Sequence, residues 1–150
     1  MAHARESIRK AVVAAVTGLA TTGTNVINWR LHAVSGDDLP QLAVMVGGGG
    51  EAVTDAIEGK YSDGEIRDIA VTIEARVAQA GTSTTVIALD TLDDICAEVE
   101  VAMMTDIPLS ALILYRKLDT TEISVEAGER PALLATQEWV IRYAVDRTNP

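Results

Sequence analysis

The sequence predicts an α+β fold, with a mainly antiparallel sheet and two helices packed on one of its faces. Apolar and polar side chains alternate over residues 66–77 and again over 138–146, which is typical of half-buried β-strands. Apolar side chains recur at helical spacing over residues 4–21 and 90–104. The chain has 150 residues, 48% of them hydrophobic, which is the usual size of one domain. We therefore expect residues 1–150 to form a single domain.

The first helix is expected to end in the "TTGTN" sequence, because Gly and Thr interrupt the apolar pattern there. Its basic start, followed by "AVVAAVTGLA", also has the outline of a signal peptide. Glu6 in the basic part and the weakly apolar Ala and Val content favour a core helix instead. The Thr, Gly and Asn interruptions argue against a membrane span. One stripe of this helix is expected to face the core: Ile8, Val12, Ala15, Val16 and Leu19.

Two alternating segments, "VINWRLHAV" from residue 26 and "QLAVMV" from residue 41, flank the turn signal "SGDDLP". This arrangement predicts an antiparallel hairpin. Residues 47–65 contain six glycines, which predicts a mobile loop with at most one helical turn. We expect this loop to order on contact with a partner, because glycine-rich loops are entropically costly to fold. Its candidate docking residues are Gly47, Gly48, Gly49, Gly50, Lys60 and Tyr61.

The second helix is expected to start near Asp90 or Thr91, either of which could cap it. Pro108 then separates it from a strand through "LILYRKL", and the last strand covers residues 138–146. Trp139 and Tyr143 are expected to point into the core from that last strand. The apolar stripe of the second helix consists of Leu92, Ile95, Cys96, Val99 and Met103.

The charge balance is acidic, with 12 basic and 22 acidic residues and a net charge of −10. Such a chain is not expected to bind nucleic acid through the phosphate backbone, which requires clustered Lys and Arg. The single cysteine, Cys96, excludes an intramolecular disulfide and suits a reducing compartment. Because Cys96 lies in an apolar helical stripe, we interpret it as an inert core thiol.

No set of residues predicts catalysis or metal binding. The only histidines are His3 and His32, and with one cysteine they form no metal-ligand spacing. The adjacent carboxylates Asp37-Asp38 and Asp93-Asp94 could bind a cation weakly, but turn formation and helix capping are the favoured interpretations. Nothing in "SGDD" or "STT" is interpreted as a nucleophile with a base, and His32, three residues before Ser35, is placed on the polar face of a strand. The chain is therefore expected not to be an enzyme and to have no catalytic, cofactor-binding or metal-binding residues.

The glycine run leaves one alternative open. Gly47, Gly49 and Ala52 fit the pattern G-x-G-x-x-A after an apolar strand, with Asp68 further on, as in dinucleotide-binding domains. The only helix available after the run, over residues 51–58, is short for the crossover that this fold needs. A small nucleotide-binding domain using the Gly47–Gly50 loop is therefore kept only as an alternative.

The remaining candidates lie on the surface. Both alternating strands place Glu and Arg on the face opposite their apolar side chains, and the first helix begins with Arg5, Arg9 and Lys10. These charges form either contacts with a neighbouring subunit or pairs within one subunit. The candidate interface residues are Arg67, Glu74, Arg76, Glu138 and Arg142, together with Val101 on the polar side of the second helix.

Taken in order, several segments resemble the tail terminator proteins of long non-contractile-tailed bacteriophages, the minor tail protein U type. The likeness extends over nearly the full chain and rests on order, spacing and length, because the family has no specific motif. The segments that carry it are "RESIRKAVVAAVTGL", "VINWRLHAVSGDDLPQLAVMV", "IRDIAVTIEARVA", "LDTLDDICAEVEVAMMTD" and "ATQEWVIRYAVD".

The resemblance implies a structural virion protein without catalysis or cofactor. Six copies would form a ring on the head-proximal end of the tail, stop addition of the major tail tube protein, and bind a head-completion or connector protein. Assembly would take place in the host cytoplasm, without a membrane. Six copies at −10 each would carry a charge of −60, which would let DNA pass the lumen without specific binding. A different head-tail connector or tail completion protein of the same kind of virus is the main alternative.

Overall fold

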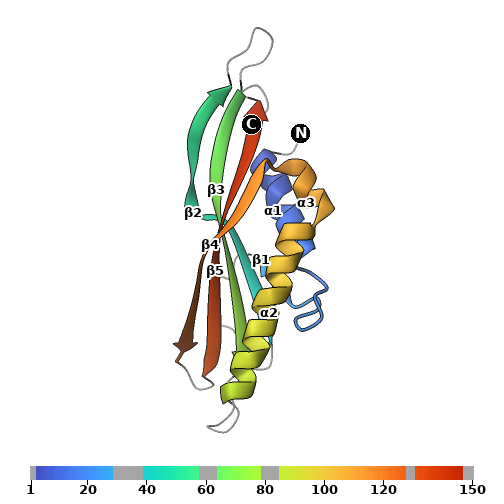
Figure 1. The fold of residues 1–150 in the computed structure, drawn as a ribbon, viewed down its shortest axis with the longest axis vertical. Helices are drawn as coiled ribbons and strands as arrows, with labels where there is room; N and C mark the ends of the chain where they lie inside the picture. Colours follow the sequence, from blue (N-terminus) through green and yellow to red (C-terminus); the bar gives the residue numbers. More distant parts are fainter. Residues whose placement is uncertain (1–2, 29–38, 58–63, 79–84, 128–130, 147–150) are drawn as a thin grey trace.

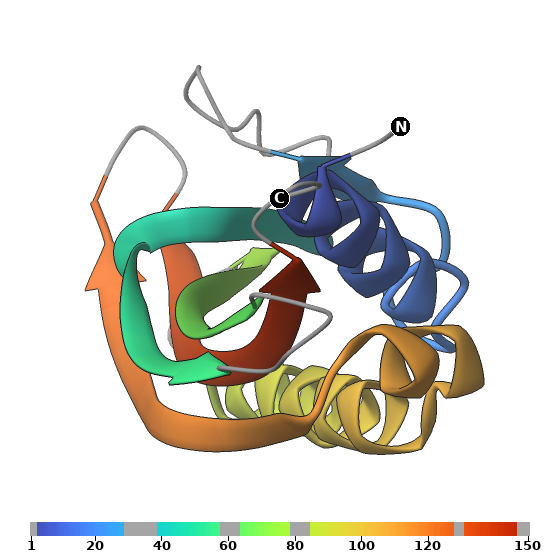
Figure 2. The ribbon, with the colours of Figure 1, turned by 90° about the horizontal axis from the view of Figure 1, so that it is seen from above.

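The fold is α+β, as predicted, and consists of long strands with helices packed on one side. The computed structural model describes residues 3–28, 39–57, 64–78, 85–127 and 131–146. The strands run along the long axis of the molecule (Figure 1), and the end-on view shows a strongly twisted sheet with the helices gathered beside it (Figure 2). In chain order the elements are α1 (Ala4–Ala15), β1 (Val26–Asn28), β2 (Gln41–Ile57), β3 (Gly64–Ala78), α2 (Thr85–Thr105), α3 (Ile107–Leu112), β4 (Tyr115–Glu126) and β5 (Ala132–Asp146).

The sheet has the strand order β1-β2-β3-β5-β4. Strands β2, β3, β5 and β4 pair in antiparallel fashion, with Ile73 opposite Gln137 at the centre of the β3–β5 ladder. Because side chains alternate along each strand, Ile69, Val71 and Ile73 share one face with Trp139. This is the face against which α1 and α2 pack.

The core lies between that face of the sheet and the helices. Trp139 and Tyr143 are fully buried in it, as predicted from the alternation of β5. The predicted stripe of α2 is also buried, which confirms the helical period read from the sequence. Its buried members are Leu92, Ile95, Cys96, Val99 and Met103. None of the described helices is long and apolar enough to cross a membrane.

The predicted hairpin of β1 and β2 is wrong, because these strands are parallel, with Val26 opposite Leu42. Twelve residues separate β1 from β2, and a connection of that length can carry the chain back to the same end of the sheet. Residues 29–38, which include the predicted inward side chain of Trp29, lie outside the described residues.

The helices differ from the prediction at their ends. α1 stops at Ala15 rather than at residue 21, and Gly18 follows with a φ of 86°, a conformation that commonly terminates helices. α2 begins at Thr85, so the predicted caps Asp90 and Thr91 lie inside it. The helix α3 was not predicted. It begins because the Asp106 side chain accepts a hydrogen bond from the Leu109 backbone N–H at 2.7 Å.

Candidate functional surfaces

The charged side chains on the face of the sheet opposite the helices are largely paired within the subunit. Arg142 on β5 lies opposite Asp68 on β3 and donates to both carboxylate oxygens, at 2.8 and 2.9 Å. The contact holds the pKa of Asp68 below its usual value, chiefly through the hydrogen bonds from Arg142. Glu138 accepts a hydrogen bond from Thr72 at 2.8 Å. These contacts fit the alternative in which the charges bridge neighbouring strands of one copy.

Arg76 lies on the same face but is not exposed to solvent. Its side chain is only 3% exposed and forms ion pairs with Glu74 at 2.6 Å and Glu126 at 2.9 Å. The sequence predicted an outward-facing charge at this position, because Arg76 alternates with the buried residues of β3. The structure instead shows a buried guanidinium held by two carboxylates, which is costly to disrupt.

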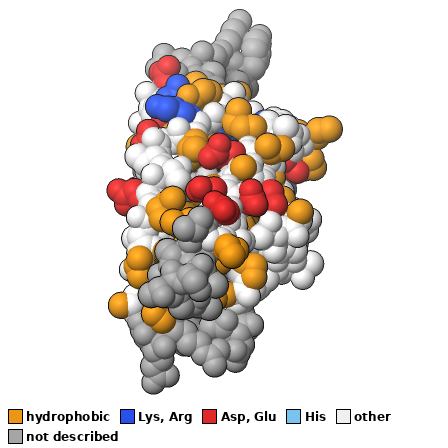
Figure 3. Space-filling model, turned by 60° about the horizontal axis from the view of Figure 1, so that its bottom comes forward, with side chains coloured by type: hydrophobic (Ala, Val, Ile, Leu, Met, Phe, Trp, Pro, Cys, Tyr) orange, Lys and Arg blue, Asp and Glu red, His pale blue; other side chains and the backbone are white. Residues whose placement is uncertain are grey.

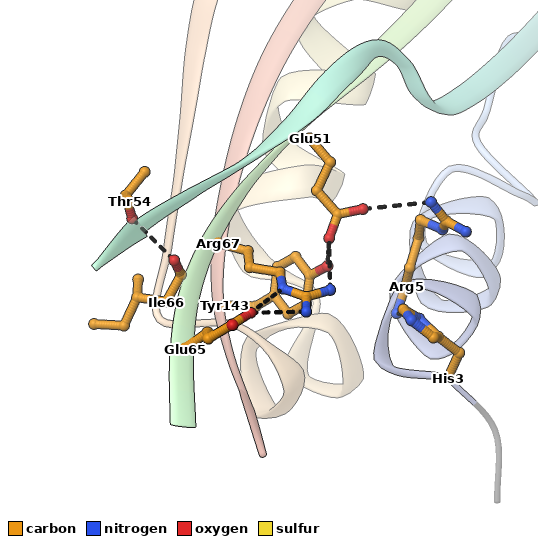
Figure 4. Close-up of polar contacts among 8 residues, drawn as sticks. All are labelled: His3, Arg5, Glu51, Thr54, Glu65, Ile66, Arg67 and Tyr143. Carbon is orange, nitrogen blue, oxygen red and sulfur yellow. Dashed lines mark hydrogen bonds and ion pairs between the residues drawn. The ribbon is translucent and has the colours of Figure 1, made fainter. Parts of the chain in front are cut away.

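Arg67 lies on the opposite face from the one predicted, the face on which the helices pack. It sits across from Tyr143 in the β3–β5 ladder and donates to Glu65 at 2.8 and 3.0 Å. Glu51 of β2 accepts hydrogen bonds from Arg67 at 3.3 Å and from the Tyr143 hydroxyl, and pairs with Arg5 of α1 at 3.4 Å (Figure 4). This polar cluster joins α1, β2, β3 and β5 at one end of the sheet.

Tyr143 is expected to make the folded protein lose stability at alkaline pH. Burial, and then the hydrogen bond to Glu51, raise the pKa of Tyr143 to about 12. An unfolded tyrosine titrates near pH 10, so above about pH 10 the unfolded chain loses a proton that the folded chain keeps. The free energy of unfolding is therefore expected to fall as pH rises from about 10 to 12. Urea midpoints between pH 8 and 11 should decline more steeply for the wild type than for Tyr143→Phe, and equal slopes would contradict this assignment.

The glycine run forms a bulge in a strand, not a mobile loop, so that prediction is wrong for residues 47–57 and 64–65. β2 continues through the run, and four residues, 47 to 50, lie between the pairs Val46–Val71 and Glu51–Ile69. Gly47 and Gly50 have φ values of 84° and 106°, which non-glycine residues rarely adopt. The chain continues from the run as strand β2 to Ile57 instead of starting a helix, so the strand-turn-helix of a dinucleotide site is not formed here. Lys60 and Tyr61 lie outside the described residues.

The bulge depends on close approach of Gly49 to β3. A Cβ atom at Gly49 would lie 2.9 Å from the Cβ of Ala70. Gly49→Ala is therefore expected to reduce the free energy of unfolding by about 1–3 kcal/mol through overpacking. Adding Ala70→Gly should relieve the clash, so that the double variant is more stable than the sum of the two single losses predicts. Strictly additive losses, measured by urea unfolding, would show that the clash is absent.

Val101 is exposed on α2, as predicted from its position opposite the buried stripe. It helps to line an apolar surface groove of about 450 Å3. The groove is formed by Leu19, Ala97, Glu98, Val101 and Ala102. Glu98 on its edge accepts hydrogen bonds from the backbone N–H and hydroxyl of Thr21, at 3.1 and 2.7 Å. These bonds fix the segment after α1 against α2 and thus hold the groove open.

Two of the remaining candidates for chemistry, His3 and Cys96, have structural roles. His3 caps α1, its Nδ1 accepting from the Arg5 N–H at 3.1 Å. Burial raises the pKa of Cys96 to about 11, so the thiol is protonated at neutral pH. Asp93-Asp94 lies within α2, whereas His32 and Asp37-Asp38 lie outside the described residues. Within the described ranges, no three His, Cys, Asp or Glu side chains group as metal ligands would.

Sequence reasoning missed the polar cluster around Glu51. The alternating pattern marks strands but does not show that Glu51, 92 residues before Tyr143, lies beside it. The one signal present in the sequence was the basic start of α1 in an otherwise acidic chain, since Arg5 reaches Glu51. Helix–sheet packing of this kind is decided by long-range contacts that local periodicity does not encode.

Comparison with known proteins shows similarity among solved structures. No protein-family model matches the chain, and no curated protein matches it. Among solved structures, the chain is similar to one described as "Virion of native gene transfer agent (GTA) particle", with 16% identity and a TM-score of 0.33. The match covers 91% of this chain and 93% of that chain.

Proposed function

We propose that this protein is a structural component of a phage-like virion, which forms a ring that caps the tail tube. The observation that carries the proposal is the apolar surface left open around α2 and α3. Val101, Met104 and Ile107 are 63%, 51% and 80% exposed, respectively. Grouped large apolar side chains on a surface mark sites of contact with other proteins. This favours an assembly protein whose surface is covered in its working state.

The resemblance of the sequence to tail terminators indicates the kind of assembly to which the protein would belong. Six copies form the ring, its tube-facing side binds the last layer of major tail tube protein, and its other side meets a head-completion or connector protein. The ring ends tube polymerisation and provides the joining surface at the head-proximal end. Assembly takes place in the host cytoplasm. The work is done by contact surfaces, so no catalytic step and no cofactor enter the proposal.

Tube growth in vitro provides the direct test. Purified major tail tube protein is polymerised from tail-tip complexes with and without this protein, and tube lengths are measured by negative-stain microscopy. We expect growth to stop when the protein is added and a ring to appear at the growing end. An unrelated acidic protein of the same size serves as control. Unchanged tube lengths, or the protein bound elsewhere on the particle, would favour a different connector or completion role.

The nucleotide-binding alternative is tested separately by thermal shift. A ligand that binds the folded state raises the melting temperature, by degrees when it is in large excess. We expect no shift with millimolar NAD or ATP. A clear rise with either nucleotide would return the glycine run of β2 to consideration as a binding site.

A further inference from the structure

The outer side of α2 has the composition of a contact surface. Asp90, Asp94, Ala97 and Val101 follow one another at spacings of four, three and four residues, which places them on one stripe of the helix. All four are exposed. Ala97 and Val101 line the apolar groove, and Asp90 and Asp94 precede them on the same stripe, so the stripe has an acidic half and an apolar half, both exposed.

The charge of α2 is entirely of one sign. The helix contains five carboxylates, of Asp90, Asp93, Asp94, Glu98 and Glu100, and neither Lys nor Arg. Acidic and hydrophobic side chains lie next to one another in the middle of the face shown in Figure 3, and Lys and Arg appear only near its upper left. A surface of this kind selects a partner that has apolar contacts and positive charge.

The beginning of α1 has the opposite character. Arg5, Arg9 and Lys10 lie within six residues, with Glu6 as the only acidic residue of the helix. A surface pocket of about 270 Å3 opens there, lined by His3, Arg5, Glu6, Arg9 and Val46.

Arg9 lines this pocket, but its Nε is buried within the subunit, so an outside carboxylate does not reach that atom. The charges open to a partner at this end of α1 are those of Arg5 and Lys10, whose side chains are 56% and 68% exposed.

We infer that these two surfaces bind each other between copies of this chain: the α2 stripe of one copy meets the basic end of α1 of the next. The partner is a second copy because the chain itself carries both the acidic apolar stripe and the basic pocket. The residues that line the groove and those that line the pocket do not overlap. The contact is therefore heterologous, and repeated head to tail it closes a ring or extends a filament. This inference rests on the proposed ring and specifies its interface.

The contact replaces the one expected from the charged strands. Arg76 and Arg142 have carboxylate partners on other strands of their own subunit, whereas the exposed stripe of α2 lies on a helix that contains no Lys or Arg. Opposite charges across such an interface set its register and exclude wrong partners.

Charge exchange between the two surfaces tests the inference. Asp94→Arg places a positive charge against the basic pocket, and Lys10→Glu places a negative charge against the acidic stripe. Each variant alone should assemble at least about tenfold more weakly than the wild type, because like charges then meet. Asp119→Arg, an exposed reversal on β4, is the matched control and should assemble normally. Native mass spectrometry measures assembly, and melting temperatures establish that every variant is folded.

Mixing the two variants gives the sharper result. Asp94→Arg chains and Lys10→Glu chains repel their own kind but fit each other at both contacts, so an equal mixture should form rings of strictly alternating chains. The chain carrying both changes should also assemble. Single variants that assemble like the wild type, or a mixture that stays monomeric, would overturn this interface while leaving the ring itself intact. A wild type that remains monomeric at all concentrations and on tube ends would instead contradict the proposed function.

Discussion

Arg76→Glu is expected to unfold much of the protein rather than to weaken contact between subunits. The Arg76 side chain is 3% exposed and lies between Glu74 and Glu126. Reversing its charge would place three carboxylates together with no cation between them. Removing one partner of a buried ion pair costs about 3–5 kcal/mol, a large part of the roughly 5–15 kcal/mol that stabilises a typical domain. Urea unfolding followed by the fluorescence of buried Trp139 and by circular dichroism would measure the loss.

The matched control is Arg142→Glu, on the same face of the adjacent strand. Its side chain is 44% exposed, so solvent screens the reversed charge and only a small loss of stability is expected. The prediction for Arg76 is wrong if both variants have the same urea midpoint of unfolding as the wild type. An Arg76→Glu chain that folds normally but no longer forms rings would place Arg76 at the subunit interface after all.

Glu51→Ala is expected to reduce the free energy of unfolding by about 2 kcal/mol. The substitution removes the acceptor of the Tyr143 hydroxyl, one of the two carboxylates that bind Arg67, and the link to Arg5 of α1. A buried hydroxyl without a partner and a partly buried guanidinium with one partner fewer both cost free energy. Because the cluster joins α1 to the sheet, amide hydrogen exchange should also accelerate in α1 beyond the global change.

Glu51→Gln separates the charge from the hydrogen bond. The amide oxygen can still accept from Tyr143 but no longer pairs ionically with Arg67 or Arg5, so an intermediate loss is expected. Glu6→Ala, which removes an exposed pair with Lys10, should change stability little. Equal stability of Glu51→Ala and the wild type would mean that the cluster does not hold α1 to the sheet.

The sequence alone was sufficient for the local elements and their buried sides. Alternation in β3 and β5 identified both strands and placed Ile69, Val71, Trp139 and Tyr143 in the core, since side chains of a strand point to opposite faces in turn. The apolar stripe of α2 identified that helix, because side chains on one helical face recur every 3.6 residues. The same repeat placed Val101 on the exposed side of the helix. These periods are properties of a single segment, so they can be read without knowing what packs against it.

Only the tertiary structure decided how the segments pair and where their charges end up. β1 pairs parallel to β2, which the long connection between them permits, and the glycine run is a bulge because β3 lies beside it and Ala70 approaches Gly49. Alternation gave Arg76 and Arg142 the same outward direction, yet one is buried between carboxylates and the other is exposed. The reason is physical: burial of a polar side chain depends on neighbours brought together by long-range contacts, which the order of residues along one strand does not contain.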